Sequence, residues 1–72
     1  MHVGERDQAG WAELRAWQDD DRLGVYVRRL RTAYEHGDRE EVRVQALRLL
    51  IDLPHDDSAA RGLLRRLRDV GE

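Results

Sequence analysis

The chain has 72 residues, a net charge of −2 and nearly equal hydrophobic and charged fractions, 40% and 39%. A chain of this length forms one small domain at most and leaves little room for an enclosed active site. Cysteine is absent, which excludes disulfides, zinc–thiolate sites and thiol nucleophiles. No apolar run approaches the ~18 residues of a membrane span, and the N-terminus lacks the apolar core of a signal peptide. We therefore expect one cytoplasmic domain over residues 1–72, with residues 1–6 flexible.

The charged residues are distributed without a strong basic region. All thirteen basic residues are arginine, a bias typical of a GC-rich bacterial genome. Residues 1–21 contain six acidic residues and two arginines, whereas the remainder contains nine acidic residues and eleven arginines. Nucleic-acid-binding domains usually carry a concentrated basic surface, so this mild polarity argues against a nucleic-acid partner.

The first predicted helix spans residues 7–18. Trp11, Leu14 and Trp17 follow one another at intervals of three residues and form a narrow apolar face. The acidic run Asp19–Asp21 comes next. We expect these aspartates to cap the following helix, because carboxylates accept hydrogen bonds from the free amides of a first helical turn.

The second predicted helix spans residues 22–36 and carries a one-sided apolar stripe, formed by Leu23, Tyr26, Val27, Leu30 and Tyr34. Gly37 is expected to end it, because glycine readily adopts the left-handed conformation of many helix stops. Asp38 is expected to begin the next helix and, with Glu41 three residues later, to form a variant of the capping box.

The third predicted helix spans residues 39–53 and has two apolar sides. One side comprises Val42, Ala46, Leu49, Leu50 and Leu53, and the other comprises Val44, Leu47 and Ile51. We therefore expect this helix to be central and covered on both sides. Pro54 follows and biases its predecessor away from helical geometry.

The fourth predicted helix spans residues 58–70, with Asp56 or Asp57 as its cap and Ser58 in its first turn. Its apolar face is formed by Ala60, Leu63, Leu64, Leu67 and Val70. The opposite face carries Arg61, Arg65 and Arg68. No alternation of period two persists along the chain, so the predicted fold class is all-α, with four short antiparallel helices joined by short turns.

The stretch from residue 34 to residue 71 resembles a tetratricopeptide-type helical hairpin followed by the start of the next unit. The residues that match are Gly37, Asp38, Ala46, Leu49, Leu50, Pro54, Asp56, Ala59, Arg61, Leu63, Leu64, Leu67 and Gly71. The resemblance is most specific to the C-terminal helices of bacterial transcriptional activator domains. It implies tetratricopeptide-like hairpins, with a small helical bundle as the alternative.

The chain offers no catalytic motif. Thr32 and Ser58 lie in no nucleophile motif, and the three histidines fall at a terminus and at two turns. The stretch Asp52–Asp56 contains one imidazole and gives no closed ligand set for a metal ion. We expect no enzymatic activity, no cofactor and no metal.

Two surfaces combine apolar anchors with arginines that could pair with carboxylates of a partner. One is the face of the first helix, with Trp11, Leu14 and Trp17. The other is a groove between the second and fourth helices, which would be lined by Tyr26, Arg29, Arg65 and Arg68. The face of the first helix is the favoured one, because a terminal helix has one side with no further chain to cover it.

The function expected from these features is that of a small protein–protein interaction module, acting as an adaptor or regulatory subunit. The partner is another protein, and a homodimer is possible. One alternative is a transcription-associated factor that contacts nucleic acid through its arginine faces. Another alternative is a helical element for homo-oligomerisation.

Overall fold

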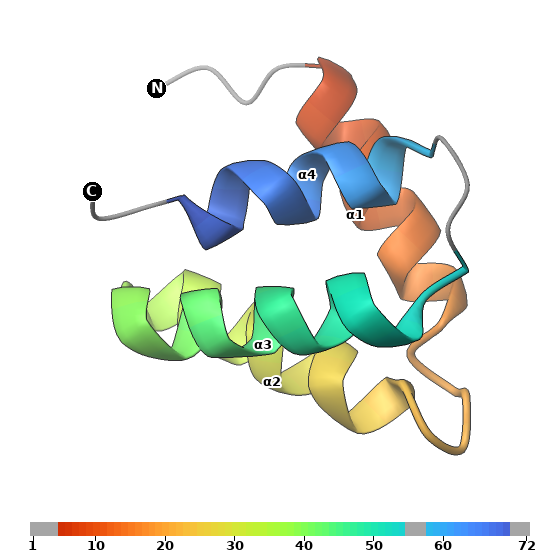
Figure 1. Cartoon of the computed structure of the whole chain (residues 1–72), viewed down its shortest axis with the longest axis horizontal. Coiled ribbons are helices and arrows are strands. Elements are labelled where there is room, and N and C mark those ends of the chain that lie inside the picture. The colour runs from red at the N-terminus through yellow and green to blue at the C-terminus, as the bar shows by residue number, and fades with distance from the viewer. Residues whose placement is uncertain (1–4, 55–57, 70–72) are drawn as a thin grey trace.

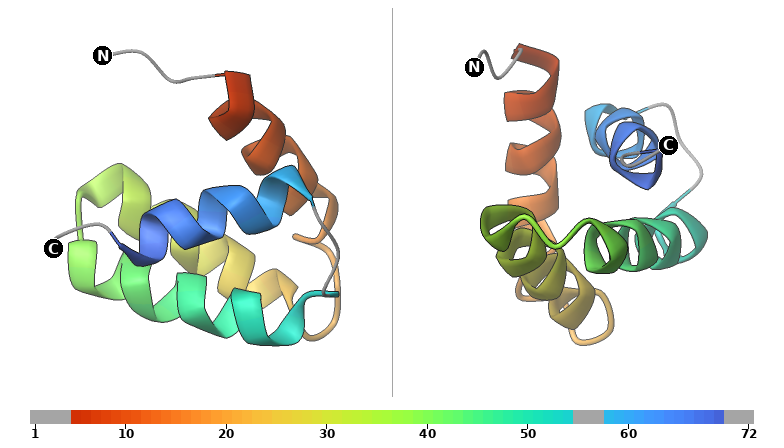
Figure 2. Two further views of the ribbon diagram at one scale, coloured as in Figure 1. Left: turned by 45° about the horizontal axis from the view of Figure 1, so that its top comes forward. Right: turned by 90° about the vertical axis from the view of Figure 1, so that its left-hand side faces the viewer.

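The computed structural model describes residues 5–54 and 58–69, and this part of the chain consists of four helices without a strand. The helices are α1 (Glu5–Ala16), α2 (Gly24–His36), α3 (Arg39–Asp52) and α4 (Ala59–Arg68). Successive helices among α2, α3 and α4 run antiparallel, and α1 lies across them at a steep angle (Figure 1; Figure 2). The predicted all-α fold with four helices is confirmed.

The bounds of α1 differ from the predicted ones by two residues at each end. The helix begins at Glu5, so part of the segment expected to be flexible is helical, whereas residues 1–4 lie outside the described residues. It ends at Ala16, because the N–H of Trp17 donates to the carbonyl of Leu14 at 2.9 Å. Such a bond spans three residues instead of four, which tightens the last turn and ends the helix.

The turn between α2 and α3 has the predicted geometry. Gly37 has a φ of 72°, in the left-handed region, and the N–H of Asp38 donates to the carbonyl of Ala33 at 2.9 Å. The Asp38 carboxylate accepts from the N–H of Glu41 at 3.2 Å. The second half of the capping box does not form, because the Asp38 N–H is already bonded. The Glu41 carboxylate instead accepts from Nε2 of Gln45 at 2.5 Å.

The turn before α2 is held by one of the three predicted capping aspartates. Oδ2 of Asp20 accepts from the N–H groups of Arg22 and Leu23, at 2.9 and 2.8 Å. These bonds stabilise a turn that ends where α2 begins, at Gly24, two residues later than predicted. Both bonds favour the ionised carboxylate, and they lower the pKa of Asp20 below its ordinary value.

The connection from α3 to α4 contains residues 55–57, so the predicted caps Asp56 and Asp57 lie outside the described residues. Within the described part, Ser58 is the N-cap of α4 and not a first-turn residue. Its Oγ accepts from the N–H of Arg61 at 3.2 Å. α4 ends at Arg68. The predicted last residue of this helix, Val70, also lies outside the described residues.

Each helix contributes one completely buried leucine to the core, and these residues are Leu14, Leu30, Leu49 and Leu64. The principal packings join α1 to α4, α2 to α3, and α3 to α4. α3 therefore contacts both α2 and α4, as expected for the central element. The predicted apolar face of α4 is buried in the same core, as its described residues Ala60, Leu63, Leu64 and Leu67 show.

The crossing of α1 over α4 depends on a glycine and a carboxylate. A Cβ atom on Gly10 would lie 2.7 Å from Cβ of Leu63 and 2.9 Å from the carbonyl oxygen of Ala59. Only glycine lets the two helices approach this closely. Nearby, Oε2 of Glu13 accepts from the N–H of Ala60 at 2.8 Å and so satisfies a free amide of the first turn of α4.

The prediction that α3 is covered on both sides is wrong for the described residues. Its first apolar side is buried, with Ala46 and Leu49 completely inaccessible. Its second side is open: Val44 and Leu47 are each 43% exposed, and Ile51 is 71% exposed. α2 and α4 pack along the same half of α3, and no further described helix lies on the other half.

Candidate interaction surface

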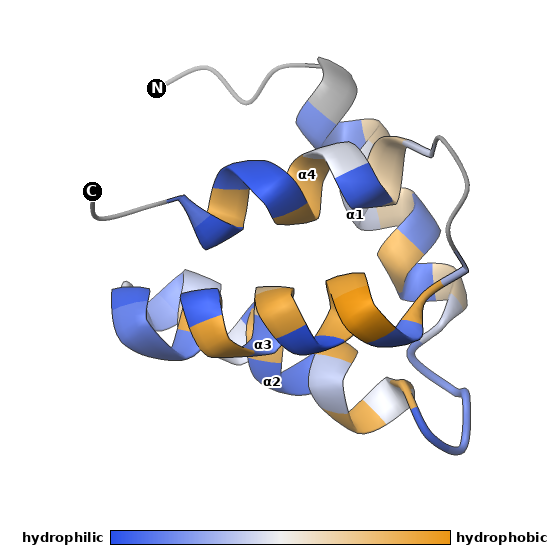
Figure 3. Ribbon diagram, viewed as in Figure 1, coloured by the Kyte–Doolittle hydropathy of each residue, from blue (hydrophilic) through white to orange (hydrophobic). Residues whose placement is uncertain are grey.

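An uncovered apolar stripe runs along α3. Val44, Leu47 and Ile51 are three and four residues apart, which aligns them on one face of a helix, and we call them the α3 stripe. In Figure 3 strongly hydrophobic segments mark α3, the front helix of the lower pair. The other large exposed apolar side chains, Val25 and Tyr34, belong to α2. A contiguous set of exposed apolar side chains is typical of an interaction site.

Arginines border both edges of the α3 stripe. Arg43 lies one turn before Leu47, and Arg48 lies one turn after Val44 on the other edge. Both arginines are exposed, and neither forms an ion pair within residues 5–54 and 58–69. The Arg48 guanidinium lies over the Tyr26 ring, 5.5 Å from its centroid, in a cation–π contact.

Trp11 of α1 and Trp17, which follows the end of α1, do not form the single face that their spacing suggested. Trp11 packs against Tyr34 of α2, with ring centroids 5.1 Å apart, and the Arg31 guanidinium lies 5.2 Å from the Trp11 ring centroid. Trp17 lines a different hollow of about 240 Å³, beside Pro54 at the end of α3. Leu14 is completely buried, and both tryptophans are only partly buried and pack on the core.

The four residues of the second predicted groove are divided among separate places. Tyr26 is partly buried and covered by Arg48 of α3. Arg29 lines a hollow formed by α2 and α3. Arg65 and Arg68 are exposed on α4, which takes no part in that hollow, and Arg68 pairs with Asp69 at 3.2 Å. Because α4 packs mainly on α1 and α3, the structure does not bring these residues into one groove.

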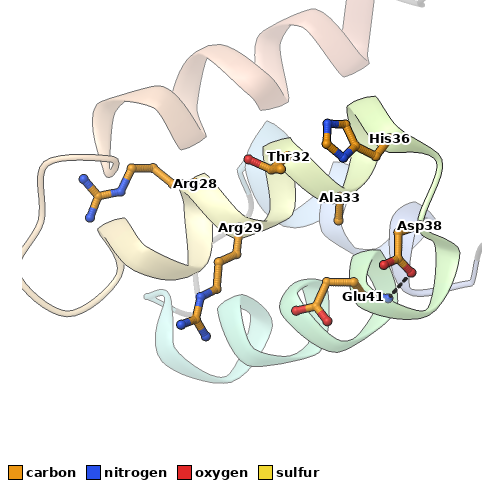
Figure 4. Close-up of a pocket in the computed structure, with 7 residues that line it drawn as sticks. All are labelled: Arg28, Arg29, Thr32, Ala33, His36, Asp38 and Glu41. Atoms are coloured by element: carbon orange, nitrogen blue, oxygen red, sulfur yellow. Dashed lines mark hydrogen bonds between the residues drawn. The ribbon is translucent and has the colours of Figure 1, made fainter.

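The hollow beside Arg29 has a volume of about 440 Å³ and mixes both signs of charge. Its lining residues are Arg28, Arg29, Thr32, Ala33, His36, Asp38 and Glu41. Figure 4 shows Arg29 extending toward α3 while Arg28 points away from it. The charged groups therefore do not converge on a common point, as they would around a small ligand.

Several arginines are engaged within the domain. Arg31 pairs with Glu35 at 2.8 Å, Arg66 pairs with Asp7 of α1, and Nη1 of Arg61 donates to the carbonyl of Leu50 at 3.0 Å. Arg61, one residue of the predicted arginine face of α4, thus helps to hold α4 against α3. Fewer of its guanidinium groups are left for phosphate than the sequence suggested.

The described residues hold no group of three or more side chains that could bind a metal ion. His55 and Asp56, which belong to the stretch Asp52–Asp56, lie outside them. None of the four helices has the length and apolar character needed to cross a membrane. One buried polar group was not anticipated: Gln45 is 4% exposed, and its Oε1 has no hydrogen-bond partner in the described structure.

Comparisons of the chain with models of protein families, with curated proteins and with solved structures find no match. A proposal for function therefore depends on the geometry and charge of its own surface.

Proposed function

We propose that this domain is a non-enzymatic protein–protein interaction module, an adaptor or regulatory subunit, and that it binds its partner through the α3 stripe. The observation that supports the proposal is the exposure of three aligned apolar side chains on the central helix. Ile51 is 71% exposed, although four leucines elsewhere in this small domain are completely buried. The described helices form a buried core that does not include the α3 stripe.

The energetics of burial support a contact at this place. Each Å² of apolar surface removed from water contributes roughly 25 cal/mol. A partner helix would bury Val44, Leu47 and Ile51 together, because the spacing of three and four residues presents them along one line. The helix under them is rigidly held, since its opposite side packs on α2 and α4.

The hairpin of α2 and α3 supports a tetratricopeptide-like shape as part of this proposal. The left-handed Gly37, the cap at Asp38 and the antiparallel α4 agree with such an arrangement. α1 does not extend the stack, because it crosses the other helices and packs mainly on α4. On this view the functional unit is the hairpin with α4, and α1 closes its core.

We favour the α3 stripe over the face of α1 as the binding site. Trp11 and Trp17 already pack on the core, and Leu14 is inaccessible to a partner. The α3 stripe lies outside the core cluster that the described residues form.

A pull-down from the source cell with variant baits tests the proposal. Leu47→Asp should lose the partners that the wild-type chain retains, while the helical circular dichroism stays unchanged. Val25→Asp is the matched control, because Val25 is 39% exposed on another helix and receives the same substitution. Trp11→Ala tests the competing face of α1. Retention of the same partners by Leu47→Asp and by Ile51→Asp would contradict the proposed site.

A further inference from the structure

We infer that the segment docking on the α3 stripe is an amphipathic helix whose apolar side chains are flanked on both edges by carboxylates. This inference rests on the proposed function and specifies the chemistry of the partner. It follows from the charges that border the stripe.

The first step is the position of the two arginines. Helical spacing puts Arg43 on one edge of the stripe and Arg48 on the other, each about one turn from an exposed apolar residue. A partner helix that lies along α3 has residues on both sides of its own apolar stripe. The residues on one side would lie near the Arg43 guanidinium, and those on the other side near the Arg48 guanidinium. Carboxylates at these positions can form charge-assisted hydrogen bonds with the guanidinium groups.

The second step is the availability of these groups. Among the described residues neither Arg43 nor Arg48 has a carboxylate within ion-pairing distance, in contrast to Arg31, Arg66 and Arg68. Contact with the Tyr26 ring restrains Arg48 at the edge of the stripe. A restrained side chain loses less conformational entropy when it binds a partner group.

The third step sets the extent of the complementary segment. Glu40 lies one turn before Val44, and Asp52 follows Ile51, so acidic residues mark both ends of the stripe. Arg43 and Arg48 are five residues apart, so the basic part of the borders covers about one and a half helical turns, or roughly 7.5 Å. Carboxylates of the partner should be concentrated over this central length, because beyond it they would face Glu40 or Asp52.

A second copy of the chain fits these charges less well. A two-fold axis centred on Leu47 would pair the α3 stripe with itself in antiparallel fashion, and each edge would meet the same edge of the copy. Arg48 would then face its own counterpart, and Asp52 would approach the edge that carries Glu41. Like charges in contact oppose such pairing. The occupant we infer is therefore an acidic helix of another protein.

Three synthetic helical peptides test the inference by fluorescence anisotropy with the full chain. All three share one leucine stripe, and the positions beside it are glutamate in the first peptide, lysine in the second and glutamine in the third. The wild-type chain should bind the glutamate peptide at least about tenfold more tightly than the lysine peptide, and added salt should reduce the difference.

Variants then locate the effect. The double variant Arg43→Glu with Arg48→Glu should reverse the preference toward the lysine peptide. Arg15→Glu with Arg28→Glu is the control, because these exposed arginines of α1 and α2 lie away from the α3 stripe and the control makes the same change in charge. Circular dichroism and light scattering on each variant verify the fold and the mass.

The outcomes separate the inference from the proposed function. Equal binding of all three peptides, abolished by Leu47→Asp, would overturn the acidic helix but leave the α3 stripe as the binding site. Binding of no peptide, or binding that Leu47→Asp leaves intact, would overturn both. A dimer of the wild-type chain that Leu47→Asp converts to a monomer would identify a second copy as the occupant and would also overturn the inference.

Discussion

Glu13 of α1 accepts a hydrogen bond from the backbone N–H of Ala60, at a distance of 2.8 Å between Oε2 and N. The two residues are 47 positions apart in the sequence, so this bond fastens α1 to the start of α4. A carboxylate at this place satisfies a free amide and interacts favourably with the positive end of the helix dipole. Ser58 caps the same terminus through the N–H of Arg61, so α4 begins with one local and one distant cap.

Replacement of Glu13 by alanine should lower the free energy of unfolding by about 0.5 to 2 kcal/mol, the usual range for a lost helix cap. Gln8→Ala is the control, because Gln8 is also exposed on α1. Chemical denaturation followed by circular dichroism measures both variants. A Glu13→Ala variant as stable as Gln8→Ala would show that the bond contributes nothing.

The ionised form of Asp20 should contribute stability that acid removes. The N–H groups of Leu23 and Arg22 lower the pKa of this carboxyl in the folded chain, so folding favours the charged form. Its contribution is complete above the ordinary pKa of the carboxyl and is lost as the pH falls through the lower folded pKa. Asp20→Asn should therefore be less stable than the wild type at neutral pH, and the difference should shrink at acidic pH.

Thermal unfolding of both chains across a pH series measures this effect. Asp21→Asn is the matched control on the neighbouring residue, which is also exposed. A difference between wild type and Asp20→Asn that stays constant from neutral to strongly acidic pH would contradict the assignment.

Two leucines of α3 should lose very different amounts of stability from the same substitution. Leu49 is completely buried, and Leu49→Ala should cost about 2 to 5 kcal/mol, enough to unfold much of so small a domain. Leu47 is 43% exposed, and Leu47→Ala should cost less than about 1 kcal/mol. Melting temperatures of the two variants provide the comparison, and equal losses would mean that the two sides of α3 are equally covered.

Gly37 and Gly62 form a second matched pair. Gly37→Ala should destabilise the chain by about 1 kcal/mol, because the φ of 72° is strained for any residue with a Cβ atom. Space is not the cause, since a Cβ atom there would meet no atom of the described residues within 4 Å. Gly62 lies inside α4, where a Cβ atom would meet, among the described residues, only Nη1 of Arg66 at 3.7 Å.

Gly62→Ala should therefore be neutral or stabilising, because alanine has the higher helix propensity. The midpoint of denaturation of Gly37→Ala should be lower than that of the wild type. The midpoint of Gly62→Ala should be equal to that of the wild type or higher. A Gly37→Ala variant with unchanged stability would contradict the conformational argument.

The sequence predicted most of the fold because the helix ends are specified locally. Gly37 and Asp38 stop one helix and begin the next through bonds to residues three to five positions away. Pro54 follows Leu53, whose backbone is extended, and α3 ends at Asp52, one residue before the predicted end. An error of two residues arises at the end of α1, where the N–H of Trp17 donates to the carbonyl of Leu14 and no glycine or proline marks the stop in the sequence.

The position of α1 could not be predicted, because its determinants are distant in the sequence. Gly10 permits a close approach to Leu63, yet a glycine within a helix gives no indication of which helix it will meet. Glu13 looked like one of many surface acids and serves as a cap for a helix that begins far along the chain. The two tryptophans suggested one face, and the crossing of α1 directs them to separate elements.

The candidate site was also only partly visible in the sequence. Periodicity identified Val44, Leu47 and Ile51 as one side of a helix, and this grouping is confirmed. Periodicity shows that a side is apolar and gives no information on whether the chain supplies anything to cover it. The exposure of the α3 stripe required the packing of α2 and α4 to be known.

The packing of α1 on α4 has a consequence for biosynthesis. The ribosome makes α1 first and α4 last among the described helices. The face of α1 that carries Gly10 therefore has no α4 to pack on while α2 and α3 are made. The hairpin of α2 and α3 can form early, because its contacts are local. We expect the hairpin of α2 and α3 to fold before α1 and α4 meet, and the chain to gain its full resistance to protease only once α1 has packed on α4.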